Sequence, residues 1–249
     1  MSHRIAVLVP SRGRPRNIER LHSTIMDTAA DPELIDLWVR LDDDDVCVPT
    51  YLGMDLGSQV RYRIGPRTKL AASWNELAEV TLSQGAGDAP RYTHLALWGD
   101  DVVPETQAWD KAFIARLLED GPGYAYSRDG IWDHTFDQQV PGQLVLPTAC
   151  VMSREIAEAM GYVSMPGLVH LCIDVGWRDL GVAAGCLFYE PTVMIRHLHR
   201  LVGALDDDTY REANDDQAQV HGDNLAYTKW RNGPEFLACL ERVKVVVKK

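Results

Sequence analysis

Apolar runs that end at glycine, proline or acidic residues divide the first half of the chain into alternating strands and helices. Residues 5–9, Ile-Ala-Val-Leu-Val, predict a buried strand, and Ile18, Leu21 and Ile25 follow at helical spacing. Strands that alternate with helices indicate an α/β protein with a mainly parallel sheet. The same pattern predicts further strands at 34–41, 59–64 and 92–98, and helices at 70–82 and from about 105 to 119.

The second half of the chain has a less regular pattern. A polar loop is expected at 128–142, and the valine-rich end at 243–249 predicts a frayed tail or a late edge strand. Pro147 lies inside a predicted strand and argues for an edge or a bend, because proline cannot donate to a sheet ladder. The expected elements are strands at 123–127, 144–152 and 193–199, a helix that starts at Ser153, and a last helix from about 223 to 240.

Two adjacent carboxylates follow the strand predicted at 92–98, which runs directly into Gly99, Asp100 and Asp101. In open α/β sheets, ligands bind at the carboxyl ends of the strands. Two acids there, after a glycine that lets the backbone turn tightly, can hold a hard divalent cation bound to a phosphorylated ligand. The alternative is a helix N-cap, for which aspartate is a common residue. This segment alone supports the two interpretations equally.

A basic turn follows the first predicted strand. Ser11, Arg12 and Arg14 are expected at the carboxyl end of that strand, where they can hold a nucleotide or a pyrophosphate. Pro15 suits the first position of the following helix. The alternative is a solvated basic loop, because the turn carries neither a dinucleotide-binding glycine pattern nor a P-loop.

Four consecutive aspartates at 42–45 follow the second predicted strand. Their mutual repulsion costs stability unless they are solvated or bound to a partner. A loop that presents one or two of these acids to a ligand is favoured over a solvated turn. Lys69 and Asn75 are expected near the same sheet edge, although Asn75 can instead be a hydrogen-bonded core amide.

His197 and His199 alternate with Leu198 in a predicted strand, so both imidazoles are expected on one face. Two histidines on one face can ligate a metal ion. The alternative is that each is a hydrogen-bonded core residue, which is the more common role of a lone histidine.

Composition narrows the class of protein. The 249 residues are 46% hydrophobic and 24% charged, as in ordinary globular proteins. The net charge of −11 disfavours a general duplex-binding surface, because such affinity comes mostly from Lys and Arg. Five cysteines without paired spacing fit reduced thiols. Since no apolar run approaches about 20 residues and no signal-peptide pattern is present, a cytoplasmic protein without a membrane segment is expected.

In this order, the motifs resemble those of the GT-A glycosyltransferases, particularly small family-2-like enzymes of the sort often carried by phages. The resemblance runs from Ile5 to about Trp230 and implies one GT-A-like domain over 1–249. Its nucleotide-sugar-binding half would be 1–122 and its acceptor-side half 123–249. A phage-encoded enzyme would work in the host cytoplasm.

The resemblance also implies a nucleotide-sugar donor, favouring a UDP-sugar, and Mn²⁺ or Mg²⁺ as cofactor. Asp174 would be the catalytic base of an inverting reaction or would position the acceptor in a retaining one, with a helix N-cap as its alternative role. The metal would be held by Asp101 with His197 or His199, and oxygen plus imidazole ligands suit Mn²⁺ better than Mg²⁺. Donor contacts would come from Pro10, Ser11, Arg12, Arg14, Asp42, Asp44, Asp45, Lys69, Asn75 and Asp100.

Two features depart from the family pattern. Gly99-Asp100-Asp101 stands where the family has D-x-D, so the division of labour between the two acids is open. No basic pair follows the late acid as it does in processive enzymes. A nucleotidyltransferase acting on a sugar phosphate and a non-catalytic nucleotide-sugar-binding module are the competing classes. The acceptor can be a protein side chain, a modified nucleic-acid base or a glycan.

Overall fold

The structure, a computed structural model, describes residues 3–86, 89–131, 146–199, 203 and 207–248. Most of the predicted loop at 128–142 and the start of the predicted strand at 144–152 lie outside them. The strands are β1 (Ile5–Ser11), β2 (Ile35–Asp42), β3 (Val60–Gly65), β4 (Gly85–Ala86), β5 (Ala89–Pro90), β6 (His94–Leu97), β7 (Val102–Pro104), β8 (Tyr124–Arg128), β9 (Cys150–Ser153) and β10 (Leu187–His197). The helices are α1 (Pro15–Thr28), α2 (Val48–Gly53), α3 (Leu70–Leu82), α4 (Trp109–Asp120), α6 (Arg154–Met160), α7 (Ile173–Ala184), α8 (Asp208–Asn214), α9 (Gln217–Arg231), α10 (Pro234–Val247) and the short 3₁₀ helix η1 (Pro32–Leu34).

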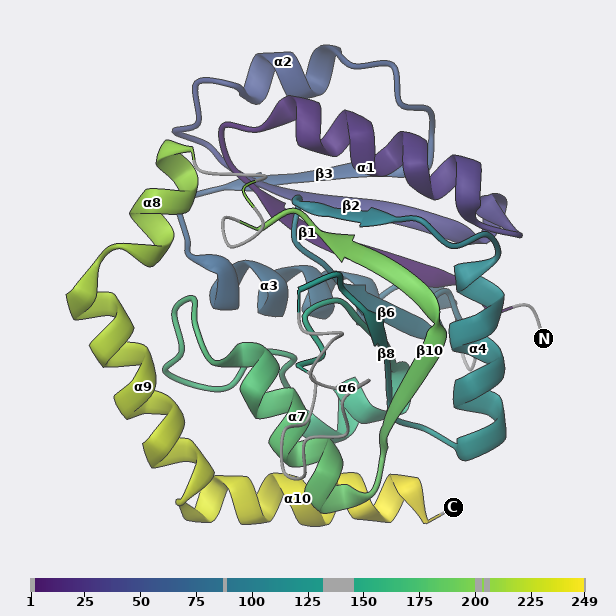
Figure 1. The fold of residues 1–249 in the computed structure, drawn as a ribbon, viewed down its shortest axis with the longest axis vertical. Helices are drawn as coiled ribbons and strands as arrows, with labels where there is room; N and C mark the ends of the chain where they lie inside the picture. Colours follow the sequence, from purple (N-terminus) through teal and green to yellow (C-terminus); the bar gives the residue numbers. More distant parts are fainter. Residues whose placement is uncertain (1–2, 87–88, 132–145, 200–202, 204–206, 249) are drawn as a thin grey trace.

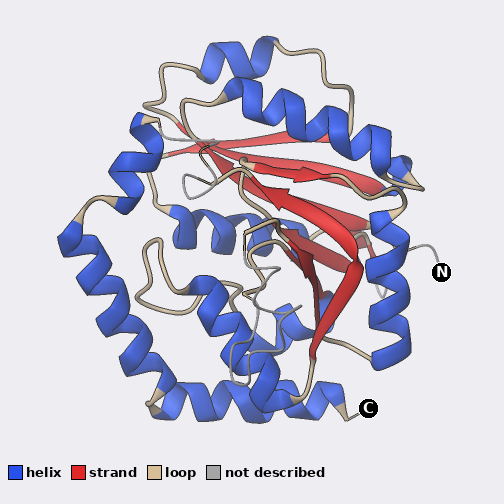
Figure 2. Cartoon of the chain, in the orientation of Figure 1, coloured by secondary structure: helices blue, strands red, loops and turns tan. Residues whose placement is uncertain are grey.

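Eight strands of the described chain form one sheet, in the order β3-β2-β1-β6-β9-β8-β10-β7. β1 pairs in parallel with β2 and β6, β2 with β3, and β8 with β10. β9 is antiparallel to both of its neighbours, and β7 is antiparallel to β10. Figure 2 shows helices packed on both faces of this sheet. The predicted α/β class with a mainly parallel sheet is confirmed.

Alternate residues of β1 pack against different helix layers. Ile5, Val7 and Val9 belong to a buried cluster with α1 and α4, whereas Ala6 and Leu8 belong to a cluster with α3, α6, α7 and α10 (Figure 1). Successive strand residues point to opposite faces, so a strand covered on both faces needs a continuous apolar run. Ile18, Leu21 and Ile25 of α1, which were predicted at helical spacing, are all buried, and so are Trp109, Phe113 and Leu117 of α4.

The segment after Asp101 is a strand and not the start of a helix. Val102–Pro104 forms β7, which pairs with residues 195–197 of β10, and α4 begins only at Trp109. Two β-branched valines suit a strand, and the pairing with β10 satisfies backbone groups that a short segment would otherwise leave unpaired. The helix N-cap interpretation of Asp100 and Asp101 is therefore wrong.

Two strands of the second half differ from their predicted positions. Pro147 precedes β9, which begins at Cys150 and lies between β6 and β8, so of the two predicted alternatives, an edge or a bend, the edge is wrong. The proline is accommodated because the ladder bonds of β9 start beyond it. β10 begins earlier than predicted, at Leu187, and ends at His197.

The predicted last helix is two helices, because Asn232 and Gly233 separate α9 from α10, which begins at Pro234. The predicted tail or edge strand at 243–249 is wrong, since α10 continues to Val247 and Val243 is fully buried. The guanidinium of Arg242 donates to the carbonyls of Ala159 and Met160 at 2.7 and 2.9 Å, which caps the end of α6. None of the described helices is both long and apolar enough to cross a bilayer.

The four parallel strands β1, β2, β3 and β6 end at one edge of the sheet. Ser11, Asp42 and Gly65 are the last residues of the first three, and Gly99, Asp100 and Asp101 follow closely after β6. Ligands of open α/β sheets bind at such an edge. The polar motifs of the first half are therefore brought together by the order of the strands.

Candidate functional site

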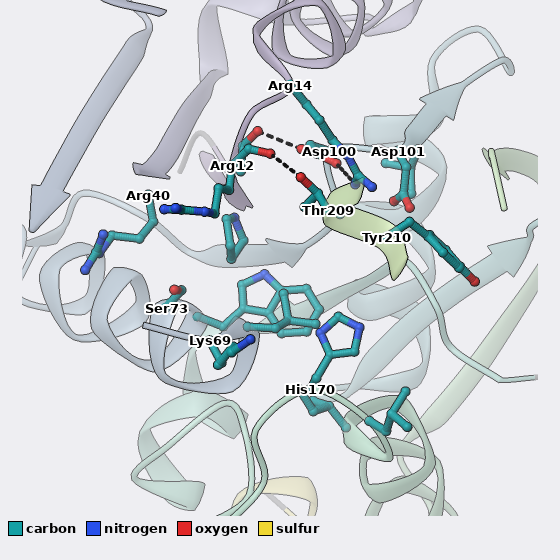
Figure 3. A pocket seen from close by; sticks show the side chains of 18 of the residues that line it. Arg12, Arg14, Arg40, Lys69, Ser73, Asp100, Asp101, His170, Thr209 and Tyr210 are labelled. Carbon is teal, nitrogen blue, oxygen red and sulfur yellow. Dashed lines mark hydrogen bonds and ion pairs between the residues drawn. The ribbon is translucent and has the colours of Figure 1, made fainter. Parts of the chain in front are cut away.

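A cavity of about 340 Å³ opens at this edge, which is within the size range of small-molecule sites. Figure 3 shows Asp100 and Asp101 facing Lys69, Ser73 and His170 across it, with Thr209 and Tyr210 of α8 at its side. Three predicted site residues, Asp44, Asp45 and Asn75, do not line the cavity. The predicted residues that do line it are Pro10, Ser11, Arg12, Arg14, Asp42, Lys69, Asp100, Asp101, Asp174, His197 and His199.

Asp100 is buried and hydrogen-bonded to neighbouring side chains. It is only 4% exposed, and its carboxylate accepts hydrogen bonds from Ser11 Oγ at 2.6 Å and from Arg14 Nη1 at 3.1 Å. Burial raises the pKa of Asp100 to about 6, against the opposing effect of the Arg14 charge. Asp100 therefore connects β1 and its basic turn to the loop after β6.

Asp101 is paired with His197, at the end of β10. Asp101 Oδ2 and His197 Nε2 are 3.3 Å apart, and the backbone N–H of Leu198 donates to the Asp101 carbonyl at 2.8 Å. Burial works to raise the pKa of Asp101, but the hydrogen bond and charge of His197 outweigh it and the pKa is lowered. Burial likewise works to lower the pKa of His197, and Asp101 reverses this so that the pKa is raised. Without a bound cation, the two side chains therefore favour an ion pair.

The pair Asp101 and His197 fits part of a divalent-cation site. Two ligands about 2.1 Å from an ion and at right angles to each other lie about 3.0 Å apart, close to the separation of these two atoms. Among the described residues, no group of three His, Cys, Asp or Glu side chains could hold a metal ion by itself. A cation at this pair would therefore take its remaining ligands from water or from a bound phosphate.

His199 lies beyond the end of β10, so the predicted strand does not reach it. Its ring lies 5.2 Å from that of His197, centroid to centroid, and both line the cavity. His199 Nε2 is hydrogen-bonded to the hydroxyl of Tyr210 on α8. Because this nitrogen is already engaged, His197 is the better placed of the two histidines to share a cation with Asp101.

The four aspartates at 42–45 have separate roles. Asp42 is buried and accepts from Arg12 Nη1 and from the backbone N–H of Thr68, both at 3.1 Å, at the wall of the cavity. Asp44 is half exposed and pairs with Arg12 at 2.5 Å. Asp45 is buried behind the basic turn, where it accepts from the N–H groups of Gly13 and Cys47. Asp45 therefore shapes the turn from outside the cavity.

Asn75 has the role of a core amide. Its Oδ1 accepts from the backbone N–H groups of Val163 and Ser164, each at 2.9 Å, and its Nδ2 donates to the Ser164 carbonyl at 3.0 Å. The side chain therefore joins α3 to the loop after α6. The sequence around Asn75 could not show whether the side chain is a core amide or contacts the donor. Its hydrogen-bond partners lie about 90 residues further along the chain.

Replacing Asn75 with alanine is expected to lower the free energy of unfolding by about 1–3 kcal/mol, because two backbone N–H groups lose their acceptor. Nucleotide affinity measured at a temperature well below unfolding should stay unchanged. Urea unfolding and a nucleotide titration measure the two effects. Glu79→Ala, at an exposed position of the same helix, is the control, and a loss of affinity without a loss of stability would contradict the structural role.

Asp174 lies in the first turn of α7 and lines the cavity. Its Oδ1 accepts from the backbone N–H of Val175 at 2.8 Å, so the carboxylate also interacts with the helix start. Burial raises the pKa of Asp174, with the Val175 hydrogen bond opposing it. An aspartate with a raised pKa that lines a cavity is a candidate for proton transfer.

Several residues of the cavity were not singled out in the sequence. His170 is one of them: burial lowers its pKa, and the backbone N–H groups of residues 169–171 all donate to the buried carboxylate of Asp223. The cavity residues that were missed belong to no recognisable sequence motif. Near α8, the acidic run at 206–208 was the only local pattern that stood out in the sequence. The others include Arg40, Arg67, Thr148, Thr209 and Glu212.

The sheet order and the two helix layers define an α/β protein with a charged cavity at the carboxyl edge of its sheet. No protein-family model matches the sequence, and no curated protein matches it.

Solved structures do resemble it. Mannosyltransferase PcManGT from Pyrobaculum calidifontis, in complex with GDP-Man and Mn²⁺, gives a TM-score of 0.63 at 14% identity, over 99% of this chain and 70% of that one. S. aureus TarS in complex with UDP gives 0.55 at 9% identity, over 91% and 71%. A mycobacterial protein gives 0.56 at 13% identity, over 94% and 81%. At such low identities these similarities establish the fold, which is that of GT-A glycosyltransferases.

Proposed function

We propose that the protein is a metal-dependent glycosyltransferase that moves a sugar from a nucleotide-sugar donor, with a UDP-sugar favoured, to an acceptor hydroxyl. The observation that carries the proposal is the cavity at the carboxyl edge, where the pair Asp101 and His197 lies in the same space as Asp174. Structures of the same fold bind GDP-Man with Mn²⁺ and UDP. The family-2-like character and the phage origin remain predictions of the resemblance, and the cytoplasmic location remains a prediction of the sequence pattern.

Each part of the cavity has a role in such a reaction. Asp101 and His197 would hold Mn²⁺ or Mg²⁺, which when bound neutralises charge on the departing nucleoside diphosphate. Arg12 and Lys69 supply positive charge on the donor side, and Asp42 offers carboxylate oxygens to the N–H or hydroxyl groups of a nucleoside. Asp174 would accept the proton of the acceptor hydroxyl as that oxygen attacks the sugar.

Titration with UDP-, GDP- and TDP-sugars is expected to raise the melting temperature only when Mn²⁺ is present, and most with a UDP-sugar. A ligand that binds only the folded state at 100 times its dissociation constant stabilises it by about 2.7 kcal/mol. Differential scanning fluorimetry with Mn²⁺ or with EDTA measures this, followed by an assay for released nucleoside diphosphate. Release of pyrophosphate from a nucleoside triphosphate and a sugar phosphate would instead identify a nucleotidyltransferase.

A further inference from the structure

Three side chains of helix α8, Thr209, Tyr210 and Glu212, line the cavity, and Figure 3 shows the first two at its side. Thr209 Oγ1 donates to the backbone carbonyl of Arg12 at 3.1 Å. A C-terminal segment therefore closes part of a site that is otherwise built from the ends of the sheet strands. The contacts at the two ends of α8 differ in kind.

At its start, α8 is anchored by a buried cation. Asp207, which caps the helix by accepting from the N–H of Tyr210, forms a two-point pair with Arg14 at 2.7 and 2.5 Å. Arg14 is 10% exposed and also pairs with the buried Asp100. Two-point arginine–carboxylate pairs are strong and geometrically specific. The start of α8 is therefore held firmly to the basic turn after β1.

Near its other end, α8 places one carboxylate between two cations of the cavity wall. Glu212 Oε1 pairs with Lys69 Nζ at 3.1 Å and with the guanidinium of Arg67. The hydrogen bond from Lys69 is the main reason that the pKa of Glu212 is lowered, so Glu212 is ionised at neutral pH. The three side chains are 39–49% exposed, and exposed pairs of this kind are weak. This contact can therefore be exchanged for another anion.

We infer that Glu212 is an internal anion that occupies a phosphate subsite formed by Arg67 and Lys69, and that a phosphate of the nucleotide sugar displaces it on binding. The inference rests on the proposed function for the identity of the ligand. The pair between Asp207 and Arg14 keeps the start of α8 at the cavity while the ion pairs of Glu212, near the other end of the helix, are broken. Glu212 is thus an affinity- and specificity-setting residue of the donor site.

The exchange has a direction set by charge. A diphosphate carries more negative charge than one carboxylate and can contact both cations, whereas an uncharged sugar or nucleoside offers nothing to replace Glu212. Binding of an uncharged ligand would leave the pairs in place and gain nothing from Arg67 or Lys69. Arg67 and Lys69 therefore select for ligands with phosphate groups, and Glu212 lowers the affinity for every ligand that must displace it.

The test is isothermal titration calorimetry of the full chain with inorganic pyrophosphate and with UDP, both in the presence of Mn²⁺. Glu212→Gln keeps the size of the side chain and removes its charge, and it is expected to tighten both ligands about two- to fivefold, the value of a weak ion pair. The control is Asp208→Asn. Asp208 is fully exposed on the same helix and pairs only with Arg211 among the described contacts, so this variant changes net charge equally without touching the cavity.

A gain in Glu212→Gln that exceeds the gain in Asp208→Asn supports the inference, and adding Arg67→Gln should remove that gain. Equal affinities in Glu212→Gln and Asp208→Asn would overturn it, while leaving the proposed function intact if wild-type protein still binds UDP. Tighter pyrophosphate binding in Glu212→Gln with no sugar released from any nucleotide sugar would uphold the phosphate subsite and overturn the proposed function. Absence of pyrophosphate and UDP binding in every variant would overturn the subsite.

Discussion

Replacing Asp101 with asparagine is expected to lower the turnover number about 100-fold or more and to abolish the Mn²⁺-dependent part of donor binding. The neutral amide is a poor ligand for a hard cation, and charge stabilisation on a departing diphosphate contributes several kcal/mol. The change keeps the side-chain volume, so the fold should survive. Release of nucleoside diphosphate measures turnover, and thermal shift with and without Mn²⁺ measures binding.

Asp43→Asn is the matched control for Asp101→Asn. Asp43 is exposed on the loop after β2 and does not line the cavity, so losing its charge should change turnover little. A metal-independent thermal shift that is equal in wild type and Asp101→Asn would exclude a cation at the pair with His197. The same result would still be compatible with donor binding by Arg12, Lys69 and their neighbours without a metal ion.

The two acids of Gly99-Asp100-Asp101 illustrate what sequence alone could not decide. Local chemistry makes them equivalent, yet the chain turns so that Asp100 points back to Ser11 and Arg14 while Asp101 meets His197. Each of these partners lies more than 80 residues away in sequence. The helix-cap alternative was removed by the pairing of β7 with β10, which is equally non-local.

The elements that were predicted well are those whose cause is local. The helix at 70–82 and the buried stripe of Ile18, Leu21 and Ile25 follow from apolar spacing and from the residues at the helix ends. The parallel order of the first strands then brings Ser11, Asp42 and Asp101 to one edge without further information. The outline of the site was predictable for this reason.

The contribution of α8 was not predictable, because its role depends on pairs formed across the molecule. Glu212 meets Lys69 143 residues away, and Asp207 meets Arg14 193 residues away. In the sequence this segment is an acidic stretch that is indistinguishable from a solvated surface. The prediction that Asn75 and Asp45 line the cavity was wrong for a related reason. Their side-chain oxygens accept hydrogen bonds from backbone N–H groups of other segments.

Replacing Asp174 with asparagine is expected to lower the turnover number by about 10²–10⁴-fold while leaving the affinity for the nucleotide almost unchanged, since general-base catalysis contributes that much. The carboxylate lies on the α7 side of the cavity and, within the described part of the chain, forms no hydrogen bond or ion pair with the residues proposed to hold the nucleotide. Asparagine can still accept from the Val175 N–H. Turnover with saturating donor, compared with nucleotide affinity from calorimetry, separates the two effects.

The pH dependence tests the role of Asp174 independently of the substitution. A base acts in its deprotonated form, so turnover falls as pH drops through its pKa. Because burial raises the pKa of Asp174, the acid limb of the wild-type profile should lie above the ordinary aspartate value of about 3.9. Asp174→Asn should lose that limb together with the rate. If the limb persists at the same pH in Asp174→Asn, the proton passes to another group, and the neutral imidazole of His170 in the same cavity is then the residue to replace.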